Sequence, residues 1–220
     1  MTSAEKKKLI ASVAEEVKQK FEHEGSGHDW WHIYRVWKMA ARIGRKESAD
    51  MLLVELGALL HDIADWKFHN GDDSVGPRVA SEMLAARGVT PEIISKVALI
   101  ISQVSFKGAG VKTKPSTLEG MIVQDADRLD AIGAIGIART FAFSGHMNRP
   151  MHVPGLKPVF HKTKESYKKS TTSTINHFYE KLLLLKGLMN TKEAKKIAAD
   201  RHAFMQEYLK RFFSEWEGKS

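Results

Sequence analysis

Residues 58–69, ALLHDIADWKFH, join the most hydrophobic predicted helix of the chain to a His-Asp pair. Leucines at positions 52, 53, 56, 59 and 60 recur every three or four residues, which predicts a helix that starts near Ser48 and turns an apolar face to a core. An aspartate at the end of such a helix is costly to bury unless it is paired or bound to a metal. His61-Asp62 is therefore the first candidate for chemistry, although a single His-Asp dipeptide is common.

Two other helical segments offer partners for this pair. His32 lies on an apolar stripe whose next members follow at Val36, Met39 and Ile43, and an inward histidine needs partners for its ring nitrogens. Taken alone, such a histidine is more often a hydrogen-bonded core residue than a ligand. Together with an acid from residues 124–130, QDADRLD, the set has two imidazoles and two carboxylates on three helices, which suits a divalent metal.

The same three-to-four-residue periodicity of apolar residues predicts helices along most of the rest of the chain. Further helices are predicted over 3–24, 30–46, 77–87, 90–101, 118–127, 131–141, 163–187 and 191–217. Residues 104–117 are expected to form a loop, and the proline-rich segment 144–160 is a lid, a partner-binding loop or an inert connection. No segment shows the alternation of apolar and polar residues that is typical of a β-strand. We therefore predict an all-α protein with a single domain over residues 1–220.

Composition excludes several classes of protein. Of the 220 residues, 43% are hydrophobic and 27% charged, which is not the composition of a disordered chain. The absence of cysteine excludes disulfides and Cys-ligated metals, and it fits a cytoplasmic location. No apolar run reaches the ~20 residues of a membrane helix, so we expect no membrane partner.

The net charge of +8 comes mainly from residues 157–220, which hold 14 basic and 7 acidic residues. Because the lysines there alternate with glutamates, the solvated face of lysine-rich helices explains this excess. We therefore expect no nucleic-acid partner. The leucine run at 182–185 is compatible with a homodimer formed through these helices as well as with a closed core.

Three blocks of sequence occur in order: GHDWWHIYRVWKMA (27–40), ALLHDIADWKFH (58–69) and VQDADRLDAIGAIGIARTF (123–141). They resemble the motifs of the HD-domain metal-dependent phosphohydrolases, and the resemblance covers about residues 20–145. Within that superfamily the chain is similar to bacterial proteins that cut nucleoside triphosphates to monophosphate and pyrophosphate. The resemblance implies an HD-domain helical bundle with additional C-terminal helices over about residues 163–217.

The resemblance also implies the metal site. Its ligands fall on His32, His61, Asp62 and Asp127. Asp125 competes with Asp127, but two residues along a helix are about 200° apart, so only one of them faces the metal. Four ligands leave open positions on an octahedral ion, and Mn²⁺ is expected from the family, although Mg²⁺, Co²⁺, Ni²⁺ or Fe would also fit.

The same blocks supply a candidate base and candidate phosphate ligands. Asp65 follows Asp62 by three residues, and in related enzymes an acid at this offset orients or deprotonates the attacking water. A triphosphate needs several cations around it. The candidates are Arg35, Lys67, His69, Lys107 and Arg128. Each of them is also open to interpretation as a surface charge or an ion-pair partner.

We therefore expect a metal-dependent hydrolase whose metal-bound water attacks the α-phosphorus of a (deoxy)nucleoside triphosphate and releases monophosphate and pyrophosphate. A nucleotide monophosphatase or a cyclic phosphodiesterase on the same site is the alternative within enzymes. A non-catalytic module, with a structural metal and basic C-terminal helices that bind nucleic acid or protein, is the alternative from another class.

Overall fold

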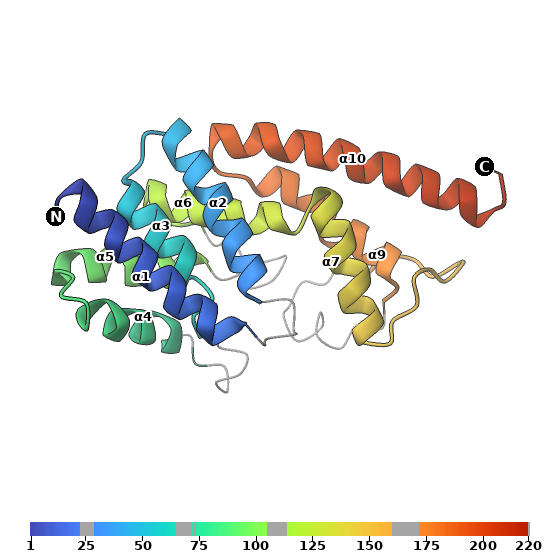
Figure 1. Cartoon of the computed structure of the whole chain (residues 1–220). Helices are drawn as coiled ribbons and strands as arrows, with labels where there is room; N and C mark the ends of the chain where they lie inside the picture. Colours follow the sequence, from blue (N-terminus) through green and yellow to red (C-terminus); the bar gives the residue numbers. More distant parts are fainter. Residues whose placement is uncertain (23–28, 65–71, 73, 105–113, 160–171, 220) are drawn as a thin grey trace. The chain divides into compact units, whose positions relative to one another are not determined.

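The structure is a computed structural model that describes residues 1–22, 29–64, 72, 74–104, 114–159 and 172–219 (Figure 1). All regular elements within these ranges are helical, which confirms the all-α prediction. No helix in the described ranges is both long and apolar enough to cross a bilayer. The described residues form two compact units, divided after Ala126, and each is described by itself. The prediction of a single domain over residues 1–220 stays a prediction.

The first unit is built around α3. Its helices are α1 (Ser3–Phe21), α2 (Trp30–Lys46), α3 (Met51–Leu60), α4 (Val75–Ala85), α5 (Pro91–Val104) and most of α6 (Leu118–Asp130). Eight of the ten residues of α3 are buried, and the helix contacts α1, α2 and α5. At Gly57 an added Cβ would come within 3.0 Å of Ile100 and 3.3 Å of Val123, so glycine lets α3 approach α5 and α6 closely.

Side-chain caps fix where these helices begin. The Asp29 carboxylate accepts a 2.8 Å hydrogen bond from the backbone N–H of His32, which confirms the predicted start of α2. The start of α3 differs from the prediction, because Asp50 rather than Ser48 is its N-cap and accepts from the backbone N–H of Leu52. Ser48 instead lies in the turn before α3, with a φ of 57°.

The second unit closes around aromatic side chains. It comprises the last turn of α6, α7 (Gly133–His146), α9 (Thr174–Glu180), the 3₁₀ helix η2 (Leu182–Leu188) and α10 (Lys192–Trp216). Phe178 of α9 is fully buried and stacks on Tyr208 of α10, with 5.9 Å between ring centroids. Phe141 of α7 contacts both rings, so one aromatic cluster joins three helices.

The division between the two units falls inside α6, between Ala126 and Asp127, and α6 continues without a break to Asp130. In the second unit the end of this helix is held by two arginines. Arg139 of α7 donates to the Asp130 carboxylate at 2.6 Å, and Arg201 of α10 donates to the carbonyl of Leu129. These bonds add to the backbone hydrogen bonds that Ala131 and Ile132 donate to the carbonyls of Arg128 and Leu129, and together they hold the last turn of α6.

One predicted element is wrong. A continuous helix over 163–187 was expected, but α9 begins only after Ser173, whose hydroxyl accepts from the backbone N–H of Asn176, and it ends at Glu180. Lys181 has non-helical torsions of φ −140° and ψ −59°, which separate α9 from the leucine run that follows, and this run forms a 3₁₀ helix. Residues 160–171 lie outside the described part of the chain.

The segment 144–160 was predicted to be irregular, but its first three residues belong to α7, which ends at His146; residues 147–159 contain no helix. The segment is attached to α9 by hydrogen bonds. The backbone N–H of Thr174 donates to the Pro150 carbonyl, that of Ile175 donates to Met151, and the Asn176 amide donates to Leu156. The segment therefore lies against α9 along much of its length.

Gly136→Ala should destabilise the second unit. An added Cβ would overlap the carbonyl group of Ala131, and backbone cannot move aside cheaply, so we expect a loss of about 1–3 kcal/mol in the free energy of unfolding. Gly145→Ala on the same helix is the matched control. Its Cβ meets nothing within 4 Å, and alanine favours the helix by up to about 1 kcal/mol. Chemical denaturation measures both, and equal stabilities for the two variants would contradict the packing at Ala131.

The stability of the protein should fall in mild acid because of His177. Burial, together with the charges of Lys181 and Arg149, lowers the pKa of His177 from 6.5 to about 3. Between pH 6.5 and pH 3 the His177 imidazole is protonated in the unfolded chain but neutral in the folded chain. The free energy of unfolding therefore falls as the pH drops below 6.5. Between pH 7 and pH 5.5 this group removes about 1 kcal/mol of stability.

Denaturant midpoints at pH 7 and pH 5.5 test this prediction. His177→Gln should lose less stability between the two pH values than the unaltered protein, whereas His146→Gln, at the exposed end of α7, should match the unaltered protein. If His177→Gln also matches it, the acid sensitivity comes from other groups.

Candidate metal centre

His61 presents one nitrogen ready to bind a metal. The residue follows the last turn of α3 and is 6% exposed. Its Nδ1 lies 2.8 Å from the carbonyl oxygen of Ala58, and because a carbonyl only accepts, Nδ1 carries the proton. The lone pair is then on Nε2, which is buried and has no hydrogen-bond partner. A backbone carbonyl on one ring nitrogen and a buried lone pair on the other are typical of metal-binding histidines.

His32 of α2 is 1% exposed and lies beside His61, with 5.4 Å between the two ring centroids. The carboxylate of Asp62 is close to both rings, since its Oδ2 lies 3.5 Å from Nε2 of His32 and 3.5 Å from Nε2 of His61. The Asp62 side chain is 21% exposed. The predicted His-Asp pair and His32 thus come together at the ends of two helices.

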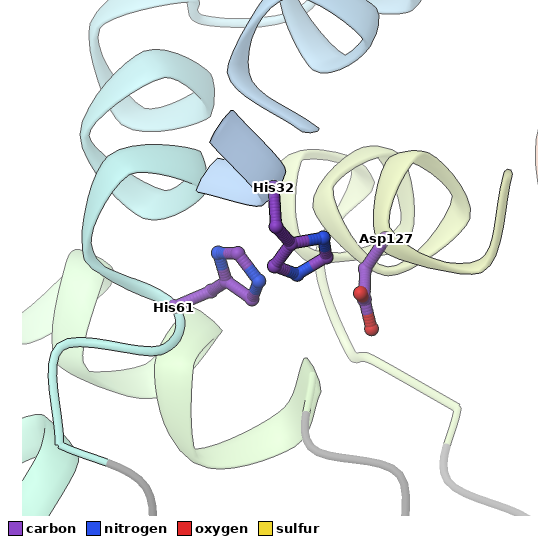
Figure 2. A group of neighbouring side chains, drawn as sticks. All are labelled: His32, His61 and Asp127. Carbon is purple, nitrogen blue, oxygen red and sulfur yellow. The ribbon is translucent and has the colours of Figure 1, made fainter. Parts of the chain in front are cut away.

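Asp127 completes the cluster from α6, the helix that contacts α3 through Val123. His32, His61 and Asp127 each offer a ligand atom within 4.8 Å of the other two. Figure 2 shows the Asp127 carboxylate and both imidazoles converging from three helices on one region. Asp125, the competing acid, is fully buried on the same helix, about 200° away from Asp127.

These residues fit a divalent ion. Two imidazole nitrogens and carboxylate oxygens suit manganese, iron, cobalt or nickel, and coordination would satisfy the buried Nε2 of His61. Coordination would also stabilise the Asp62 carboxylate directly after so apolar a helix as α3.

The other predicted site residues are placed differently. Asp65, Lys67, His69 and Lys107 lie outside the described residues. Arg35 is half-buried on α2. Arg128, next to Asp127, donates a hydrogen bond to the carbonyl of Leu188, so at least part of its guanidinium supports the second unit. The roles of all these residues in catalysis or phosphate binding stay predictions.

Sequence reasoning missed two supporting contacts. The Ala58 carbonyl that orients His61 is one; the signal was available, because a histidine after a helix end lies near the carbonyl three residues before it. The other is Arg139, which pairs with Asp130 one turn beyond Asp127. The sequence contained no local signal for this pair, because Arg139 belongs to the next helix.

Comparisons with known proteins agree with this geometry. The pattern of the HD domain family matches residues 30–132, which contain the whole cluster. YpgQ of Bacillus subtilis (strain 168), an uncharacterised protein, is 40% identical over 198 residues, 89% of this chain and 87% of its own length.

Solved structures of relatives share the fold over nearly the whole chain. A Lactobacillus plantarum protein has a TM-score of 0.82 at 37% identity and covers 99% of both chains. An HD-superfamily hydrolase from Bacillus thuringiensis has a TM-score of 0.77 at 40% identity and covers 96% of this chain and 98% of its own. Bacillus subtilis YpgQ in complex with ADP has a TM-score of 0.76 at 34% identity and covers 96% of each chain.

His61→Ala should weaken metal binding while leaving the fold intact. Removing the ligand nitrogen should raise the dissociation constant for Mn²⁺ by at least about 100-fold, more than the loss of an outer contact costs. Paramagnetic resonance of free Mn²⁺ measures the constant, and circular dichroism checks the helices. His146→Ala, an exposed histidine on α7, is the control and should bind as the unaltered protein does. Unchanged Mn²⁺ affinity in His61→Ala would refute the metal centre.

Proposed function

Because the chain belongs to the HD-domain family, we propose that it is a metal-dependent phosphohydrolase. The observation that carries the proposal is the cluster of His32, His61 and Asp127, with Asp62 against both imidazoles. A solved relative is named an HD-superfamily hydrolase, which supports the same class of reaction.

In this proposal His32, His61, Asp62 and Asp127 hold the ion. When bound, the ion lowers the pKa of a water molecule and neutralises charge on the phosphate under attack. His61 has no part in proton transfer, because its Nδ1–H is committed to the Ala58 carbonyl and its Nε2 serves as a ligand. Another group must therefore take the proton of the attacking water.

Asp65 is our choice for that base, three residues beyond Asp62. The proposed phosphate ligands are the cations of the same sequence blocks: Arg35, Lys67, His69, Lys107 and Arg128. A phosphoanhydride carries several negative charges, so a group of cations both binds it and stabilises the charge that develops on the leaving group.

We propose a nucleoside triphosphate, cut to monophosphate and pyrophosphate, as the substrate. Two observations support a nucleotide: the resemblance of the three sequence blocks and the complex of the relative YpgQ with ADP. A monophosphatase or a cyclic phosphodiesterase would use the same ligands, and only the products distinguish them. The homodimer and the cytoplasmic location likewise stay predictions.

Analysis of products by mass spectrometry tests the proposal. The metal-stripped protein receives Mn²⁺ and a panel of nucleoside tri-, di- and monophosphates, and we expect monophosphate and pyrophosphate from a triphosphate. Asp62→Ala should abolish turnover, because it removes a carboxylate 3.5 Å from both imidazoles. Asp200→Ala, an exposed aspartate on α10, is the control and should retain full activity.

The products decide between the alternatives. Inorganic phosphate or a ring-opened nucleotide would keep the metal centre and change the reaction to that of a phosphatase or a phosphodiesterase. Full turnover by Asp62→Ala would refute the site. No turnover of any nucleotide by a protein that binds Mn²⁺ would refute the proposed substrate class and favour the non-catalytic alternative.

A further inference from the structure

The exposed face of α2 has an unusual composition. Six residues of this helix are exposed, and each of them is aromatic or cationic: Trp31, Tyr34, Lys38, Arg42, Arg45 and Lys46. The helix contains no acidic residue. A helix face that only contacts water normally mixes both signs of charge, as α10 of this protein does.

These six side chains form a continuous stripe, which we call the α2 stripe. At 100° per residue they fall within an arc of about 120°, with Trp31, Lys38 and Arg45 spaced seven residues apart along its centre. The stripe is about 22 Å long. The flanking acids Asp29 and Glu47 are each nine residues from Lys38, which places them about half a turn away from the stripe.

Aromatic rings and cations contact one another within the α2 stripe. Trp31 is 60% exposed, and its ring meets that of Tyr34 edge to face, with 5.9 Å between centroids. The ammonium group of Lys38 lies 5.1 Å from the Tyr34 ring and 4.0 Å from that of Trp37. These contacts hold large flat rings at the surface. The Trp31 ring stays exposed although its burial would be favourable.

We infer that the α2 stripe binds single-stranded nucleic acid. Lysine and arginine side chains spaced along a groove or helix follow a phosphodiester backbone, and exposed aromatic rings stack on unpaired bases of any sequence. Both kinds of group are present on one face, in the same unit of the structure. This combination is what a single strand, with its charged backbone and free bases, requires.

Other anionic partners fit the stripe less well. An anionic bilayer is bound by helices that insert aliphatic and aromatic residues opposite a basic face, and the exposed residues of α2 include no aliphatic side chain. An acidic protein surface would pair with the cations but leave Trp31 and Tyr34 without a role. Of these partners, only a polynucleotide would use both the cations and the aromatic rings of the α2 stripe.

This inference differs from our expectation that no nucleic acid binds. That expectation was based on the distribution of net charge along the sequence. The basic excess lies in the C-terminal helices, where basic and acidic residues alternate. The structure adds which cations share one exposed face. The inference is independent of the proposed hydrolysis, because His32 lies on the buried side of α2.

Fluorescence anisotropy with a labelled oligo(dT) twelve nucleotides long tests the inference. EDTA is present, so that no divalent ion at His61 contributes to phosphate binding. Four exposed cations should give a slope of about −3 for the logarithm of the association constant against that of the salt concentration. Lys38→Ala/Arg45→Ala should bind at least about 10-fold more weakly at low salt and halve that slope, to about −1.4.

Removal of an aromatic ring tests the stacking. Trp31→Ala should weaken binding about 5- to 150-fold, the range for loss of one base–ring stack, and Trp31→Phe should restore most of it. Two controls come from α10 of the second unit. Lys195→Ala/Lys196→Ala removes two exposed positive charges, and Phe204→Ala removes a ring that is 52% exposed. Both controls should bind as the unaltered protein does.

Four outcomes would overturn the inference. They are an absence of oligo(dT) binding at low salt, equal losses in the α10 controls, binding to anionic vesicles but not to oligo(dT), and a homodimer that the α2 variants dissociate without any change in oligonucleotide affinity. Binding that is lost only in the α2 variants would support it. A failure of nucleotide hydrolysis leaves this test unaffected, because it is done without metal.

Discussion

The metal centre depends on a single constraint, the position of the His61 ring at the end of a buried helix. α3 is too apolar to end in a polar side chain unless that side chain is fully satisfied. The Ala58 carbonyl takes the Nδ1 proton, so the buried Nε2 faces Asp62 and His32 with its lone pair. A bound ion would compensate the burial of these polar atoms, and the apolar environment would in turn strengthen the interaction between ligands and ion.

The third helix of the cluster has to be held as firmly as the first two. Asp127 lies in the last turn of α6, and helix ends fray when their carbonyls lack partners. Arg201 donates a second hydrogen bond to the carbonyl of Leu129, beside the one from the backbone N–H of Ile132, and Arg139 pairs with Asp130, which is 4% exposed. The C-terminal helices therefore do more than enlarge the protein, since they supply the donors that fix the turn in which a candidate ligand lies.

Periodicity was enough to predict the helical class, and the resemblance of the three sequence blocks predicted that His32, His61 and Asp127 come together. Two features had no sign in the sequence: the interruption of the helix at Lys181, and the Arg139–Asp130 pair, which joins two helices. The candidate base and several phosphate ligands lie in segments outside the described residues, so their placement stays a prediction.

α2 shows why net charge alone does not locate a binding surface. Its buried side carries His32 among apolar neighbours, and its exposed side carries the α2 stripe. The net charge sums over all faces of the protein, whereas a long polyanion contacts one face at a time. At moderate salt, charges interact only over roughly 10 Å, so the polyanion is attracted only by the cations near its contact face. The first 156 residues hold 20 basic and 19 acidic residues, so a near-neutral balance there conceals a strongly cationic helix face. Binding depends on how many cations lie close together on one exposed face, and the folded helix determines which cations these are.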